Sequence, residues 1–334
     1  MDHQSSNGIL EDFRIEFLEY WRRLPNKGFF LVLLAAWLVL FCFLGNSTLG
    51  YIGSKSLIYW MFFIYNAKGL DQVAGEEQGN LVPFVVLALF WWKRKELFAG
   101  ELKLWWPGLG IFVSGLVIHI IGFMVQQPRI SIVGLFVGIY GLTGLAWGLN
   151  WLRASFFPFF LFAFMVPLGT LSLPITFRLR LWVSEIVEAI CGNVLMIDIN
   201  RNGTALLDPS GRFQYEVAAA CSGIRSLIAT VALSIVYAWL SFGKWWKRGL
   251  LVAAAFPLAI LGNVMRMLLI VLASELGGRA HGQEWGNFVH ENLFFSLVPY
   301  VPAFAGLMLL GHWLREPQGT PTPTPTLPME AKTV

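Results

Sequence analysis

Three side chains able to do chemistry lie in the last three long apolar segments of the chain: Cys221, Arg266 and His290. Ionisable side chains are costly to bury in hydrocarbon, so their presence on neighbouring membrane helices indicates a site by default. A cysteine attacks an acyl carbon only as the thiolate, which needs a base or a nearby positive charge. His290 can act as the base, and Arg266 supplies the charge and a donor for an oxyanion. Together these groups can form and resolve a thioester.

Two further polar residues are candidates for supporting roles. Asn263 precedes Arg266 by three residues and shares its helix face, where it can orient the guanidinium or a substrate carbonyl. Its alternative role is a hydrogen bond between membrane helices. Arg225 follows Cys221 by about one helical turn and can pair with a carboxylate or assist the thiolate.

Each residue type also has an ordinary interpretation. A lone cysteine on an apolar helix is usually a small hydrophobe, which is the role we assign to Cys42. A membrane arginine can snorkel or pair with a carboxylate such as Glu275 or Glu216, and a histidine at a helix start can meet the headgroups. His281 and His312 are competing bases, one in a loop and one near the other membrane face. The joint occurrence of the three candidates on consecutive helices favours a site.

The composition is that of a polytopic membrane protein. Of the 334 residues, 56% are hydrophobic and 13% are charged, and the mean hydropathy is +0.63. A soluble domain has fewer apolar and more charged residues. The net charge of +4 comes from short basic clusters between apolar segments, which argues against nucleic acid as a partner. The three cysteines form no CxxC pair, so they encode neither a zinc site nor a disulfide framework, although one disulfide on the outer side stays open.

Apolar windows near the length that crosses a bilayer predict an all-α protein with about eight transmembrane helices. The windows are 29–46, 79–92, 105–126, 130–149, 154–173, 217–241, 250–274 and 290–313. Residues 56–66 form another apolar stretch that lies at the interface or enters the membrane in part, so a count of seven or nine stays open.

Basic residues between the windows fix the expected orientation. Under the positive-inside rule they place both termini in the cytoplasm. We therefore expect a cytoplasmic N-terminal segment (1–28), a transmembrane domain (29–313) and a disordered Thr/Pro-rich cytoplasmic tail (314–334). Cys221 then lies roughly 6 Å and Arg266 roughly 12 Å from the outer end of its helix. The site faces the extracytoplasmic side.

One long outer segment, residues 174–216, is expected between the fifth and sixth windows. Residues 175–191 carry apolar side chains near helical spacing among charged ones, which predicts an amphipathic helix. The turn signals Asn202-Gly203 and Asp208-Pro-Ser-Gly211 separate short runs rich in β-forming residues. These signals predict a small extracytoplasmic β-hairpin.

The motifs that carry this chemistry resemble those of the exosortase/archaeosortase family. They are Ala220-Cys-Ser-Gly-Ile-Arg-Ser-Leu227, Gly262-Asn-Val-Met-Arg-Met267 and Val289-His-Glu291. The resemblance extends over residues 155–313 at least. Phe294 stands where the family often has glycine, and His290 stands where archaeal members tend to have arginine, so the bacterial branch is the better match.

The resemblance implies a membrane transpeptidase and cysteine protease of the bacterial inner membrane, with no cofactor or metal. Its substrates would be exported proteins with a C-terminal sorting signal made of a short motif, a membrane helix and a basic end. Cys221 would be the nucleophile, Arg266 the oxyanion or thiolate stabiliser and His290 the general acid/base. The product would pass to an acceptor linked to extracellular polysaccharide. Two other functions stay open: a membrane acyltransferase that uses a lipid donor, and an anion transporter.

Overall fold

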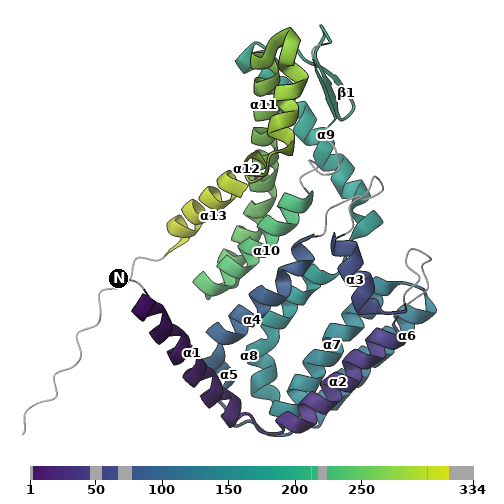
Figure 1. Ribbon diagram of the computed structural model, residues 1–334, viewed down its shortest axis with the longest axis vertical. Coiled ribbons are helices and arrows are strands. Elements are labelled where there is room, and N and C mark those ends of the chain that lie inside the picture. The colour runs from purple at the N-terminus through teal and green to yellow at the C-terminus, as the bar shows by residue number, and fades with distance from the viewer. Residues whose placement is uncertain are drawn as a thin grey trace, which may run out of the picture. The chain divides into compact units, whose positions relative to one another are not determined.

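The computed structural model describes residues 3–45, 55–66, 77–211, 213–216, 224–298 and 300–315. These residues are mostly helical, with one small sheet (Figure 1). Contacts divide the chain into two units, Met1–Trp182 with Glu216–Ala229, and Val183–Tyr215 with Thr230–Val334. The predicted helical architecture is therefore confirmed.

The first unit is a set of helices, most of which are apolar. Both α2 and α6 pack along α7 (Figure 1). The elements of this unit are α1 (His3–Arg23), α2 (Lys27–Phe43), α3 (Leu57–Asn66), η1 (Glu77–Asn80), α4 (Val82–Trp92), α5 (Arg94–Leu97), α6 (Pro107–Met124), α7 (Pro128–Trp147), α8 (Leu149–Phe160), η2 (Leu161–Met165) and η3 (Gly169–Ser172).

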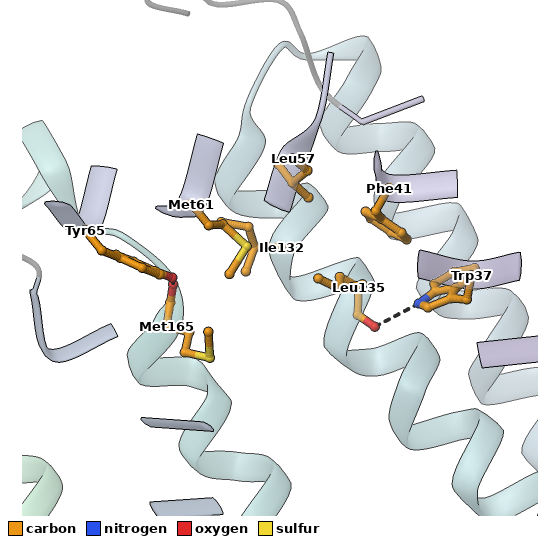
Figure 2. Packing of buried hydrophobic residues seen from close by; sticks show 8 residues of the cluster. All are labelled: Trp37, Phe41, Leu57, Met61, Tyr65, Ile132, Leu135 and Met165. Carbon is orange, nitrogen blue, oxygen red and sulfur yellow. Dashed lines mark hydrogen bonds between the residues drawn. The ribbon is translucent and has the colours of Figure 1, made fainter. Parts of the chain in front are cut away.

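The core of this unit joins α2, α3, α7 and η2 (Figure 2). Its buried side chains are Trp37, Phe41, Leu57, Met61, Tyr65, Ile132, Leu135 and Met165. The Trp37 Nε1 group donates to the Leu135 carbonyl at 3.1 Å, and the Tyr65 hydroxyl donates to the Met165 carbonyl. The polar atoms of these two buried aromatic residues are thus satisfied inside the unit, as an apolar environment requires.

Glycines allow α6 and α7 to approach closely. A Cβ atom on Gly115 would lie 2.5 Å from the Gly138 nitrogen. Small residues at such crossings are a common means of helix association in membranes. We expect Gly115→Leu to destabilise the protein by about 3 kcal/mol, the upper range for overpacking. Thermal unfolding in detergent should show this loss, whereas Gly110→Leu on the same helix, where a Cβ meets nothing within 4 Å, should unfold like the wild type. Equal unfolding temperatures for the two variants would contradict the packing described.

The second unit combines the sheet with the C-terminal helices. Its elements are η4 (Cys191–Leu195), β1 (Asn200–Asn202), β2 (Ala205–Leu207), β3 (Gln214–Glu216), α11 (Trp245–Glu291), α12 (Leu293–Ser296) and α13 (Tyr300–Leu314), and it shares α9 (Leu173–Ile190) and α10 (Ile224–Ser241) with the first. The predicted amphipathic helix is α9. Within this unit α11 packs along α13.

The sheet has the order β1-β2-β3, with β1 and β2 antiparallel and Arg201 opposite Leu206. Both predicted turns are present. Gly203 has a φ of 62° and Gly211 a φ of 75°, values that favour glycine. The predicted hairpin is therefore β1–β2, and the β-forming run after the second turn adds a third strand, β3, to it.

The helices coincide with the predicted windows, but their lengths differ. Among the described residues three helices are long and apolar enough to cross a membrane (α6, α7 and α11), or up to four if α1 and α2, bent by 93°, form one span. The others are shorter apolar helices of 10–17 residues. The number of eight transmembrane helices therefore stays a prediction.

One predicted boundary was wrong. The eighth window was expected to begin at His290, yet His290 is the penultimate residue of α11 and the last long helix begins at Tyr300. The reason is local, because Asn292 is extended and its side-chain oxygen accepts from the Phe294 backbone nitrogen at 2.9 Å. That bond ends one helix and caps the next.

Candidate active site on a helical hairpin

α11 folds back on itself at Gly278. Residues 245–277 and 279–291 are helical, whereas Gly278 has a φ of 59° and a ψ of −154°, a conformation suited to glycine. In a straight helix Arg266 and His290 would lie about 36 Å apart. Instead, Arg266 Nη2 donates to the His290 carbonyl oxygen at 3.0 Å. α11 is thus a helical hairpin, and its returning arm, residues 279–291, lies beside the first arm (Figure 1).

Arg266 keeps one buried donor available. Its Nε atom is buried and has no hydrogen-bond partner among the described residues. A buried donor without a partner costs about 1–3 kcal/mol, and an acceptor on a bound molecule would remove that cost. Asn263 is buried on the same helix three residues earlier. The guanidinium therefore holds the backbone of His290 with one N–H group and can bind an oxygen with another.

Strand β3 fastens the returning arm. The Tyr215 hydroxyl donates to the Gln283 carbonyl at 3.0 Å, and the Gln214 backbone nitrogen donates to Gln283 Oε1 at 3.1 Å. Ser274 Oγ, on the first arm, lies 3.2 Å from the Tyr215 hydroxyl. Burial raises the pKa of Tyr215, so the hydroxyl keeps its proton at neutral pH and stays a donor. One side chain thus links β3 to both arms.

Tyr215 and Gly286 were not predicted from the sequence. A Cβ atom on Gly286 would lie 2.0 Å from the Tyr215 hydroxyl oxygen and 2.2 Å from Ser274 Oγ, so this position needs glycine. A signal for this packing was present, because Gly282 and Gly286 are four residues apart and so share one helix face. Tyr215 carried no comparable signal, since a single tyrosine in a polar segment has many ordinary roles.

Two of the three predicted catalytic residues lie on α11. The structure brings Arg266 and His290 together, with Asn263 one turn from Arg266 on the same helix. Cys221 lies outside the described residues, and Arg225 is the second residue of α10. The competing base His281 is exposed and lies 2.9 Å from Glu284 Oε2, at the far end of the returning arm from His290.

Cys191 is a buried thiol at the start of η4. Burial raises its pKa to about 11, so at pH 7.4 roughly one molecule in several thousand carries the reactive thiolate. We expect a variant with Cys191 as its sole cysteine (Cys42→Ser, Cys221→Ser) to resist a water-soluble polyethylene glycol maleimide in native membranes and to react after denaturation in SDS. Gel mobility measures the modification. Complete modification of the native protein within minutes would contradict the buried position.

A protein family model matches a part of the chain that includes both Cys221 and the helical hairpin. The family model described as Transmembrane exosortase (Exosortase_EpsH) matches residues 72–305. This chain belongs to the transmembrane exosortase family. The match confirms the resemblance drawn from the three motifs, and with the apolar helices it identifies this exosortase as a multi-pass membrane protein. The comparison with curated proteins found no match, and neither did the comparison with solved structures.

Proposed function

We propose that this exosortase is a membrane-embedded cysteine peptidase and transpeptidase that cleaves a C-terminal sorting signal through an acyl thioester. The observation that carries the proposal is the pairing of Arg266 with the His290 backbone at 3.0 Å, which leaves a buried guanidinium donor without a partner among the described residues. An oxyanion binds such a donor better than a neutral carbonyl does. The expected nucleophile, Cys221, lies within the residues that the family model matches.

The reaction balances with the residues named. His290 takes the proton of the Cys221 thiol, and the thiolate attacks the carbonyl carbon of the scissile bond while Arg266 stabilises the oxyanion. The C–N bond breaks as His290 returns its proton to the leaving amine, and an acyl thioester remains. His290 next takes a proton from the acceptor nucleophile, which attacks the thioester and releases the thiolate. The sequence of steps needs no cofactor.

The proposal includes a location and partners. In a bacterial inner membrane crossed by about eight helices, with both termini cytoplasmic, the hairpin and Cys221 lie toward the extracytoplasmic side. The substrate is an exported protein that carries a short motif, a membrane helix and a basic end. The acceptor is a nucleophile associated with extracellular polysaccharide.

Co-expression with such a substrate tests the proposal. The size of the substrate is followed by gel in cells that carry the wild type, Cys221→Ala or Cys42→Ala. We expect processing by the wild type and by Cys42→Ala, and none by Cys221→Ala, with equal amounts of the three enzymes in the membrane.

Processing that persists with Cys221→Ala would reject the thioester mechanism. Candidate substrates are taken from the same genome, one for each C-terminal signal with this three-part layout. Failure of the wild type to process any of them would reject the peptidase function, which would leave the lipid acyltransferase and the anion transporter for direct assay.

A further inference from the structure

The N-terminal helix α1 is set perpendicular to the apolar helix α2, which coincides with the first predicted membrane window. The axes of residues 11–23 and of α2 differ by 93°, with the bend at residues 24–26. α2 is apolar almost throughout, from Phe29 to Phe43. Since membrane helices tilt by about 20° on average from the bilayer normal, a helix perpendicular to one of them runs nearly parallel to the membrane surface.

Contacts on one face fix the rotation of α1 about its own axis. Glu16 Oε1 accepts from Arg94 Nε at 2.7 Å. The ring of Phe13 lies 4.6 Å from that of Trp91, and the ring of Tyr20 lies 4.9 Å from that of Phe98. The three α1 residues follow the spacing i, i+3, i+7, which is one helix face. This face, the docked face of α1, packs against the end of α4 and against α5 with the residue that follows it.

A second face of α1 is apolar and exposed. Arg14, Phe17, Leu18 and Trp21 follow the spacing i, i+3, i+4, i+7 and form one stripe. Phe17, Leu18 and Trp21 are 47%, 40% and 38% exposed. At about 100° per residue, Asp12 and Glu19 lie on the opposite side of the helix from this stripe.

We propose that α1 lies in the membrane–water interface, with the stripe of Arg14, Phe17, Leu18 and Trp21 inserted at the headgroup level of the lipid bilayer. The continuous connection to α2 places α1 at that level, because Lys27 begins α2 and donates from Nζ to the Trp21 carbonyl at 3.1 Å. Lipid is the occupant that this connection favours, since α1 continues into a helix that is apolar from Phe29 to Phe43. Glu11, seven residues before Leu18, lies at the edge of the stripe, whereas Asp12 and Glu19 face away from it.

This placement rests on the membrane crossing by α2 and not on the proposed enzymatic activity. It adds a lipid-binding surface that the proposed reaction does not use. Interfacial helices of this kind bind through apolar area and through attraction between basic side chains and anionic headgroups.

Quenching of a fluorophore by labelled lipids tests the proposal in the full-length protein. Single cysteines are introduced by Leu18→Cys, Trp21→Cys, Asp12→Cys or Glu19→Cys in a background without the native cysteines, and each is labelled with a nitrobenzoxadiazole maleimide. The proteins are reconstituted in vesicles of phosphatidylcholine and phosphatidylglycerol that contain a lipid with a nitroxide near its headgroup. We expect at least threefold stronger quenching at positions 18 and 21 than at positions 12 and 19.

Three results would overturn the proposal. Equal quenching at the four positions would mean that α1 has no fixed membrane face. Stronger quenching at positions 12 and 19 would mean that the acidic face meets the lipid. Blue-shifted emission at positions 18 and 21 without quenching would mean that protein, such as a second copy of the chain, covers the stripe.

Discussion

Replacement of Arg266 by lysine is expected to lower substrate processing at least a hundredfold while the protein stays folded. Lysine keeps the charge and can still donate to the His290 carbonyl, but it lacks the planar fork whose Nε group is buried without a partner among the described residues. Loss of one preorganised oxyanion donor typically costs a factor of about 100–1,000 in rate. The half-life of the substrate after a pulse of label measures the effect.

Arg279→Lys is the matched control, because Arg279 is an exposed arginine on the same helix. We expect it to process substrate within about twofold of the wild type, as surface substitutions rarely have large effects. Thermal unfolding of Arg266→Lys should lie close to that of the wild type. Processing by Arg266→Lys at nearly the wild-type rate would show that a positive charge alone is enough for the reaction. The guanidinium Nε group would then have no role as an oxyanion donor.

Gly286→Ala is expected to loosen the helical hairpin and to reduce processing by about tenfold or more. The added methyl group would overlap the Tyr215 hydroxyl and Ser274 Oγ, at 2.0 Å and 2.2 Å, and overpacking of this kind costs about 1–3 kcal/mol. His290 lies one helical turn further along the returning arm, so displacement of the arm also displaces the base. Tyr215→Phe should have a smaller effect, because it removes hydrogen bonds without a clash.

Limited trypsin digestion gives a readout for this variant that does not depend on activity. Arg279 is exposed at the start of the returning arm, and cleavage there needs local unfolding of the hairpin. We expect faster cleavage at Arg279 in Gly286→Ala than in the wild type. Gly249→Ala, on the same helix with nothing within 4 Å of the added Cβ, should match the wild type. Unchanged cleavage and processing in Gly286→Ala would show that the contacts of Tyr215 with Gln283 and Ser274 do not hold the returning arm in place.

Local signals were enough to predict the apolar helices, the amphipathic helix α9 and the turns, but they gave no helix at α1. Long apolar runs gave the helices, since burial in lipid dominates over every other preference there. Asn202-Gly203 and Asp208-Pro-Ser-Gly211 gave the turns, because Gly203 and Gly211 both adopt a positive φ. Chemistry and order along the chain predicted Arg266 and His290 in one site, whereas the hydrogen bond from Arg266 to the His290 backbone was not predicted.

The hairpin could not be predicted from these signals. Residues 279–291 hold few apolar side chains, so hydropathy indicated a loop, whereas the structure makes them a helix that depends on packing against the first arm. The contact between Gln283 and strand β3 joins residues about seventy positions apart. Sequence periodicity carries no information on such partners.

The hairpin has a consequence for biosynthesis. The contacts that join its two arms lie within residues 266–290, so they can form as soon as this stretch has left the ribosome and the insertion machinery. Tyr215, which binds the Gln283 carbonyl, has been synthesised before the hairpin, whereas α13 is synthesised after it. A nascent chain that ends after Glu291 therefore already contains every residue needed to bring Arg266 to the backbone of His290, before the last helix enters the membrane.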